Sequence, residues 1–356
     1  MAHVFLASLL QSIEVSKRVD PWIGCRLYSY WYHRNGTADK YIESFVDSHK
    51  KIELLLKDQE MARVFLAGEG LGTKDRVAPH LKNRLFSYWY HKNCREGGVI
   101  GGQLKHGTKL FLDSGAFTAF TKGVTIDNAE FIDYYNAWPK GTFDIVASVD
   151  VIGDADASWA NYQVIRKQIP KVLPTFHYGE SYEFLEKMAS STQYIALGGV
   201  AQLGGGQKLL DWFDHVWGTY LVKKDGTPRV KVHGFAVTNI SAMTRYPWES
   251  VDSSSWIMTS SFGNVMLFNR NGKPIKICFS SDSPNIGKAE GWHFDRLPQA
   301  QKDVVLQILA KEHGNVTPEQ LATDYVERHI VNARSFQSLA DRIPKTFHPK
   351  EKGLFA

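Results

Sequence analysis

Polar and glycine residues stand where several apolar runs in the middle of the chain end. KLFL runs into Asp113, DIVASV into Asp150, and KVLPTF into His177. YIAL runs into Gly198 and Gly199. If these runs are parallel strands, the residues that follow them meet at one edge of the sheet, where the active sites of such folds lie.

Asp252 lies inside a later run, SVDSSSW. Two separated carboxylates in one pocket suit a reaction in which one stays ionised and attacks while the other transfers protons. Glycoside hydrolysis uses the same pairing, so Asp113 and Asp252 indicate chemistry at an acetal-like carbon, including an N-glycosidic one. Each residue also has a local explanation, because Asp and Gly favour turns and Asp150 could cap a helix. Their shared position at strand ends favours the joint interpretation.

The alternation of short apolar runs with amphipathic stretches predicts the elements that hold these residues. It indicates βα units around a buried parallel sheet, and seven or eight units favour an α/β fold of the (β/α)8 TIM-barrel type over an open sheet. Strands are expected at 64–67, 109–112, 144–149, 171–176, 194–197, 231–237 and 250–256. Helices are expected at 128–138, 155–169, 182–190, 207–222 and 240–245.

The length of 356 residues exceeds the roughly 250 that one barrel needs. We therefore expect an N-terminal appendage at 1–60, a catalytic barrel at 61–290 and a helical extension at 291–356. The extension reads as two helices, 297–313 and 318–342, with Thr317 as the cap of the second and Pro318 at its first position.

One segment is duplicated. VFLA occurs at 4–7 and 64–67, and LYSYWYHRN at 27–35 returns as LFSYWYHKN at 85–93. Two copies are too few for a solenoid, so the appendage is interpreted as a partial duplicate of 61–95. The shared SYWYH is expected to be structural, with a platform for stacking bases as the alternative.

Composition adds mild constraints. The net charge is +5 and the pI about 8.9, which permits a polyanionic partner without requiring one. The three cysteines, Cys25, Cys94 and Cys278, form no C-x-x-C pair, so neither a disulfide framework nor a cysteine-rich zinc site is expected. No apolar stretch is long enough to span a membrane and the first residues do not read as a signal peptide, which together predict a cytoplasmic protein without a membrane partner.

Three motifs resemble those of the tRNA-guanine transglycosylases. LDSGAF at 112–117 is similar to that family's Asp-Ser-Gly-Gly-aromatic segment, and ALGGVA at 196–201 to its Gly-Gly-Leu-Ala strand end. VHGFAV followed by SVDSSSWIMTSSFGNVMLFNRNG resembles the family's last stretch. The order and spacing of the motifs hold over roughly 64–276.

The resemblance implies a double displacement. Asp252 matches the nucleophile that attacks C1′ of the nucleoside and expels guanine, and Asp113 matches the general base. Six further residues match base-binding positions, and His177 falls near a family Gln that reads the base carbonyl. The six are Asp150, which reads the ring N–H and amino group; Phe117 and Phe235, which stack on the base; and the main chain of Leu197, Gly198 and Gly199.

The departures from the family matter as much. The zinc motif that follows the nucleophile in the tRNA enzymes is reduced to Cys278, and Ala116 replaces the usual second Gly. The zinc-free form resembles the DpdA branch of bacterial gene clusters and phages, which inserts 7-deazaguanine derivatives into DNA. The implied partners are double-stranded DNA and a 7-deazaguanine base, with the cyano form as first guess. No metal or other cofactor is implied, and a phage-encoded protein would act in the host cytoplasm.

Lys223, Lys224, Arg229 and Lys231 cluster before one predicted strand and are the expected DNA contacts, since phosphate binding needs such cations. The reacting nucleotide must leave the base stack. Three alternatives stay open: a tRNA enzyme that lost its zinc site, an N-glycosidase in which water replaces the incoming base, and a non-catalytic subunit. The presence of both Asp113 and Asp252 argues against the last.

Overall fold

The computed structural model describes residues 6–8, 26–28, 62–68, 74–93, 99–204, 206–269, 273–283 and 293–349. The chain divides into two compact units, 1–61 and 62–356. In the first unit the described residues form two strands, β1 (Leu6–Ser8) and β2 (Arg26–Tyr28), which pair in parallel. The rest of the predicted appendage lies outside the described residues. The duplicated copy in the second unit also begins with a parallel strand pair, β3 and β4.

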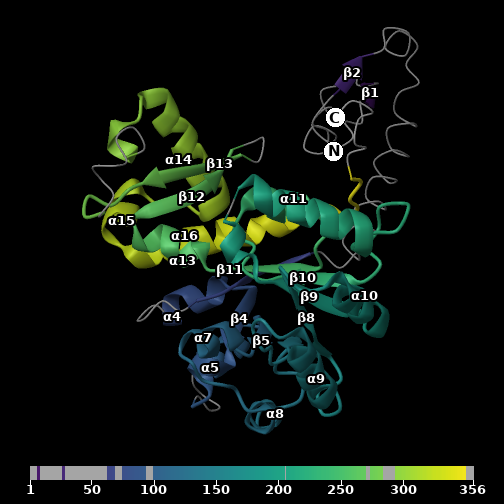
Figure 1. Cartoon of the computed structure of the whole chain (residues 1–356). Helices are drawn as coiled ribbons and strands as arrows, with labels where there is room; N and C mark the ends of the chain where they lie inside the picture. The colour runs from purple at the N-terminus through teal and green to yellow at the C-terminus, as the bar shows by residue number, and fades with distance from the viewer. Residues whose placement is uncertain are drawn as a thin grey trace, which may run out of the picture. The chain divides into compact units, whose positions relative to one another are not determined.

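A closed parallel barrel is the centre of the second unit (Figure 1). Two segments, β7 and β8, are halves of one strand on either side of Pro174, which has no N–H to donate. β7 pairs with β6 and β8 with β9, so this strand closes the ring and confirms the predicted TIM-type fold. The strands are β3 (Arg63–Leu66), β4 (Asn83–Ser87), β5 (Lys109–Asp113), β6 (Ile145–Ala147), β7 (Val172–Leu173), β8 (Thr175–His177), β9 (Tyr194–Gly198), β10 (Lys231–Gly234) and β11 (Ser250–Ser253).

Helices follow the strands and surround the barrel (Figure 1). Several begin at side-chain caps that accept hydrogen bonds from the first free backbone N–H groups, as Asp127, Asp154 and Ser181 do. Within the described ranges, no helix has both the length and the apolar character to cross a bilayer. The helices are α4 (Lys74–Val77), α5 (Tyr88–His91), α6 (Val99–Leu104), α7 (Ala116–Thr121), α8 (Asn128–Asn136), α9 (Ala155–Ile165), α10 (Tyr182–Ser191), α11 (Gln207–Val216), α12 (Ile240–Met243) and α13 (Ser255–Ser261).

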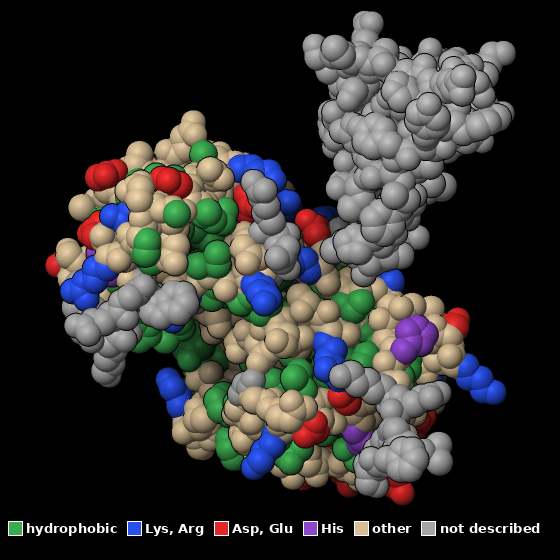
Figure 2. All heavy atoms as spheres, turned by 90° about the horizontal axis from the view of Figure 1, so that it is seen from above, with side chains coloured by type: hydrophobic (Ala, Val, Ile, Leu, Met, Phe, Trp, Pro, Cys, Tyr) green, Lys and Arg blue, Asp and Glu red, His purple; other side chains and the backbone are tan. Residues whose placement is uncertain are grey.

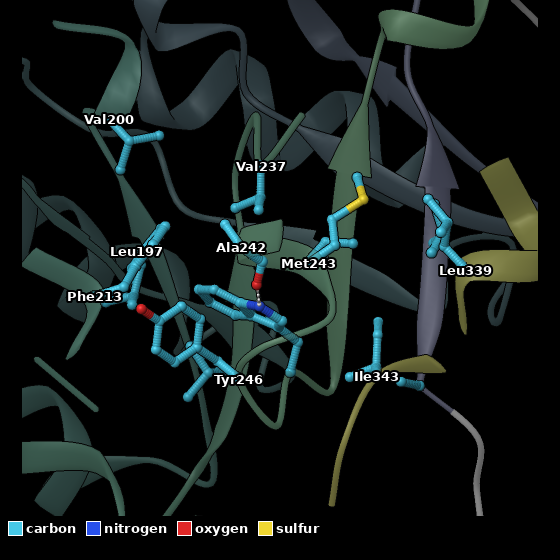
Figure 3. Packing of buried hydrophobic residues seen from close by; sticks show 14 of the residues in the cluster. Leu197, Val200, Phe213, Val237, Ala242, Met243, Tyr246, Leu339 and Ile343 are labelled. Atoms are coloured by element: carbon cyan, nitrogen blue, oxygen red, sulfur yellow. Dashed lines mark hydrogen bonds between the residues drawn. The ribbon is translucent and has the colours of Figure 1, made fainter. Parts of the chain in front are cut away.

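Alternate residues of each strand serve two different cores, because side chains point to opposite faces with a period of two. Phe65, Phe111 and Ala196 point into the barrel and fill its interior. Their neighbours Val64 and Leu197 point outward into a larger cluster beneath the helices. Figure 3 shows this outer cluster, in which Leu197 of β9 belongs with Phe213 of α11 and Tyr246.

The C-terminal part packs as a separate layer beside the barrel (Figure 1). It consists of the hairpin β12 (Asn264–Phe268) and β13 (Pro274–Cys278) with α14 (Gln299–His313), α15 (Pro318–Thr323) and α16 (Tyr325–Gln337). Thr317 and Gln320 form a capping box with Pro318 at the first helical position, which confirms the predicted start of this helix. The single helix expected over 318–342 is instead broken at Asp324, whose side chain caps α16.

The sequence pattern missed one strand and extended another too far. The pattern gave no separate strand at Asn83–Ser87, where β4 completes the barrel. The strand expected over 250–256 ends at Ser253, and α13 begins at Ser255. The helix turns Trp256 into the core, where its ring N–H donates to the Ala67 carbonyl at 2.8 Å. Trp256 is therefore a core residue.

The turn after β5 requires glycine. Gly115 has φ of +79°, and a Cβ there would lie 2.5 Å from the Cβ of Trp89 and 2.4 Å from the Ser87 hydroxyl oxygen. Trp89 comes from the duplicated motif, so that motif and the Asp113 turn are packed directly against each other.

Gly115→Ala should lower the free energy of unfolding by roughly 2–4 kcal/mol, because it adds a steric clash to the cost of a left-handed alanine. Gly123→Ala is the matched control, since Gly123 has φ of +66° and nothing within 4 Å of the added Cβ. It should cost about 1 kcal/mol. Denaturant unfolding measures both, and equal losses would contradict the packing described.

Candidate active site

A cavity of about 830 Å³ opens at the carboxyl ends of the barrel strands. All but one of the residues predicted to react with or bind the base line it: Asp113, Phe117, Asp150, His177, Gly198, Gly199, Phe235 and Asp252. They come from six different strands or the turns that follow them. The joint interpretation of the strand ends therefore correctly predicted which residues meet.

Leu197 is the exception. Its side chain is fully buried in the outer core, and its carbonyl accepts the N–H of Phe235 at 2.9 Å. It is not among the residues that line the cavity, so its predicted main-chain contact with the base stays a prediction. The strand approaches the cavity through the next two residues, where a Cβ on Gly198 or Gly199 would lie 3.1 Å from neighbouring atoms of β8 and its turn.

The predicted DNA contacts lie at the other end of the barrel. Lys231 opens β10 opposite Tyr194, the first residue of β9, and Lys223, Lys224 and Arg229 precede it. Two of the four are engaged, Arg229 with Glu186 and Lys231 with Glu249. These four residues therefore lie away from the cavity, and the structure does not bring them together with the predicted base-binding residues. On the face in Figure 2, Lys and Arg side chains stand in separate groups without one continuous basic patch.

One carboxylate oxygen of Asp252 accepts a backbone hydrogen bond. Only 6% of the residue is exposed, and Oδ1 accepts the backbone N–H of Ala236 at 2.9 Å. Ala236 has φ of +52°, an unfavourable left-handed conformation for alanine, and this conformation directs its N–H at the carboxylate. Oδ2 is left as the oxygen available to react.

A chain of buried polar groups reaches Asp252 from inside the barrel. Ser250 Oγ lies 2.6 Å from both the Tyr194 hydroxyl and Nδ1 of His233. Nε2 of His233 lies 3.3 Å from Oδ1 of Asp252 and makes no well-aligned hydrogen bond within the described residues. Burial lowers the pKa of His233, although Asp252 opposes this shift. A neutral ring that accepts the Ser250 proton at Nδ1 carries its own proton on Nε2, facing Asp252.

Asp113 ends β5 and is suited to carry a proton. Burial of its carboxyl group, with the nearby charges of Asp150 and Asp252, raises its pKa to about 7, although the backbone N–H groups of Ser114 and Gly115 oppose this. The Gly115 N–H donates to Oδ2 at 3.0 Å. A carboxyl group with a pKa near neutrality can give and take a proton within one catalytic cycle.

Asp150 is paired with a cationic histidine. Nε2 of His177 lies 3.5 Å from Asp150 Oδ2, and Nδ1 lies 3.0 Å from Glu180. Burial lowers the pKa of His177, but the hydrogen bonds and charges of the two carboxylates outweigh it and raise the pKa to about 10. Both ring nitrogens are thus occupied. Sequence reasoning missed Glu180, whose only signal was its place three residues after His177.

Two aromatic residues face the cavity from opposite strands. Phe117 follows β5 and Phe235 follows β10, and these strands are four steps apart in either direction around the ring. Phe235 packs edge-on against His233 at 4.6 Å, whereas Phe117 is 64% exposed. Two further cavity residues, Phe120 and Tyr178, were not predicted. The arrangement can hold a flat ring between aromatic faces with carboxylates at its edges.

Among the described residues, no group of three or more His, Cys, Asp or Glu side chains is arranged to hold a metal ion.

Comparisons with known proteins add little about the reaction. No protein-family model matches the chain, and no curated protein matches it. A solved structure described as a fructose-1,6-biphosphate aldolase from Coccidioides immitis is similar at 10% identity over 82% of this chain and 94% of that chain, with a TM-score of 0.39. A similarity this distant identifies neither substrate nor reaction.

Asp113→Asn should stabilise the protein in a pH-dependent way. The folded state binds more protons than the unfolded state between the ordinary carboxyl pKa near 4 and the raised pKa of about 7, so wild-type stability falls as pH rises through this window. Asn does not titrate. The Tm difference in favour of the variant should grow across the window and stay level above it, and a constant difference would contradict the raised pKa.

Proposed function

We propose that this protein is an enzyme that exchanges guanine in DNA for a 7-deazaguanine base through a covalent sugar intermediate on Asp252. The observation that carries the proposal is the unequal treatment of two carboxylates at one cavity. Asp252 accepts the backbone N–H of Ala236, whereas Asp113 has its pKa raised to about 7. This is the division of roles that a nucleophile and an acid–base group need.

In the first displacement, Oδ2 of Asp252 attacks C1′ of the deoxyguanosine. The bond from C1′ to N9 breaks, and Asp113 in its protonated form supplies the proton that guanine takes up as it leaves. The bond from C1′ to Oδ2 forms, so the sugar is held as an ester. Oδ1, which accepts the Ala236 N–H, becomes the ester carbonyl oxygen.

In the second displacement, the incoming base occupies the same position. Asp113, now ionised, removes its N9 proton, and N9 attacks C1′ as the ester bond breaks. Asp252 regains its full charge at this step, and the Ala236 N–H, with the His233 ring 3.3 Å away, stabilises Oδ1 as the carboxylate leaves. No electron transfer takes place, since one C–N bond replaces another.

The rest of the cavity suits recognition of a guanine-like base. Asp150 lies beside the cationic His177, and a carboxylate can accept hydrogen bonds from the ring N–H and amino group of guanine. Gly198 and Gly199 line the cavity, and glycine lets the main chain approach a bound ring closely. The volume lies within the roughly 300–1,000 Å³ of small-molecule sites.

Asp252→Ala should reduce the incorporation of labelled guanine into DNA at least about a thousandfold, because the covalent route is lost. Asp133→Ala, on the exposed face of α8, is the matched control and should keep full activity. Circular dichroism would check folding. Full exchange by the Asp252 variant would overturn the mechanism, exchange confined to tRNA would overturn the DNA substrate, and abasic sites in the product would indicate base excision.

His233→Leu should slow exchange roughly 10- to 100-fold, because it removes an N–H that faces Oδ1 of Asp252 from 3.3 Å and can donate to it as charge returns to that oxygen. His233→Gln should recover part of the rate, because its amide N–H can take the place of Nε2–H. Single-turnover assays should show the larger effect on discharge of the ester, when Oδ1 regains charge. Equal losses in both variants, in step with a lower Tm, would mean that His233 only fills space.

A further inference from the structure

The duplicated SYWYH motif has two faces in the second unit. Tyr88 is buried among Phe131 and Tyr134, and His91 is buried with Nδ1 2.8 Å from the Ser87 carbonyl oxygen. These residues are structural, as the sequence predicted. The two between them, Trp89 and Tyr90, are not buried, and Tyr90 is 66% exposed. Burial within the unit therefore accounts for Tyr88 and His91 but leaves Trp89 and Tyr90 partly or largely exposed.

The exposed half adjoins the cavity. The Tyr90 hydroxyl lies 3.4 Å from the Thr118 hydroxyl on α7. Phe117 and Phe120, three residues apart on that helix, line the cavity and are 64% and 57% exposed. Large aromatic side chains grouped on a surface in this way usually mark a binding site. We call Trp89, Tyr90, Phe117 and Phe120, with the lysines described next, the aromatic rim.

Two lysines complete the rim. Nζ of Lys92 lies 4.7 Å from the centre of the Trp89 ring, and Nζ of Lys122 lies 5.8 Å from it. Both lysines are exposed. Trp89 thus has two positive charges near its ring, and it packs against the Gly115 turn that follows Asp113, a residue of the cavity. Cations outside a negatively charged cavity would attract the backbone of a polyanion while leaving the reacting base to the carboxylates.

We propose that the aromatic rim binds the DNA nucleotides that flank the reacting guanosine, in an unstacked, single-stranded form. The inference rests on the proposed function, which requires the target base to leave the helix. Flanking bases that lose their neighbour can stack on aromatic side chains, and their phosphates can pair with lysines, as in proteins that bind single strands. A protein partner would need no lysines beside the aromatic rings, so the charge favours the nucleic acid.

The experiment measures equilibrium binding of a fluorescent single-stranded oligodeoxynucleotide to the full-length protein over a series of salt concentrations, with no free base present. Lys92→Gln/Lys122→Gln removes the rim charges, and Tyr90→Ala/Phe120→Ala removes two rings. The matched control is Lys223→Gln/Lys224→Gln, which removes the same charge at the amino end of the barrel. Because no exchange is needed, the result is independent of catalysis.

The Lys92/Lys122 variant should weaken binding and lower the log–log salt slope by about 1.4, the value for two phosphate contacts to a single strand. The Tyr90/Phe120 variant should weaken binding about tenfold or more with little change in slope. The control should bind like the wild type, and a matched duplex should bind more weakly than the single strand.

Three outcomes would overturn the proposal: wild-type binding by both rim variants, loss of binding in the Lys223/Lys224 control, or tighter binding of RNA than of DNA of the same sequence. If binding depends on the rim but the protein exchanges no base, the proposed reaction is wrong and the proposed role of the rim is retained. If the protein exchanges the base and the rim variants bind and react like the wild type, the proposed reaction is retained and the proposed role of the rim is wrong.

Discussion

Repulsion between carboxylates that share one cavity is the constraint on which the site depends. Asp113, Asp150 and Asp252 line the same cavity. Three negative charges there repel one another unless each is stabilised by a partner or neutralised by a proton. Asp252 accepts a backbone N–H at one oxygen, and Asp150 has a cationic partner in His177. Asp113 is buried beside the charges of the other two carboxylates, and its pKa rises to about 7. The three roles in the proposed reaction follow from this unequal sharing of charge.

The closed parallel ring creates that constraint. Because all its strands run in one direction, whatever follows them is collected at a single opening. The ring closes through one strand divided at Pro174, whose halves serve different neighbours. Inside the barrel, His233 and Ser250 lie among apolar residues. They form a chain of polar contacts that reaches Asp252 at the opening.

Sequence reasoning located eight of the cavity residues, among them three of its four carboxylates, because strand ends are visible as apolar runs that stop at a polar residue. It could not find Glu180 or Ala236, since their roles arise from turn geometry: one folds back onto His177, the other adopts a positive φ. It placed Lys231 and its neighbours before a strand, which is where they lie, but gave no information on their distance from the cavity. It also gave no information on which face Leu197 presents, and the side chain of that residue faces the outer core.

The left-handed backbone at Ala236 has a consequence for how this surface can evolve. A single alanine in that conformation costs about 1–2 kcal/mol relative to an ordinary one, so glycine would relieve the molecule of a standing penalty. Glycine would also loosen the amide that points at Asp252, while a β-branched residue would fit poorly. Few residues are therefore suitable at this position. A substitution that raises the stability of the protein would leave the N–H group less firmly directed at Asp252.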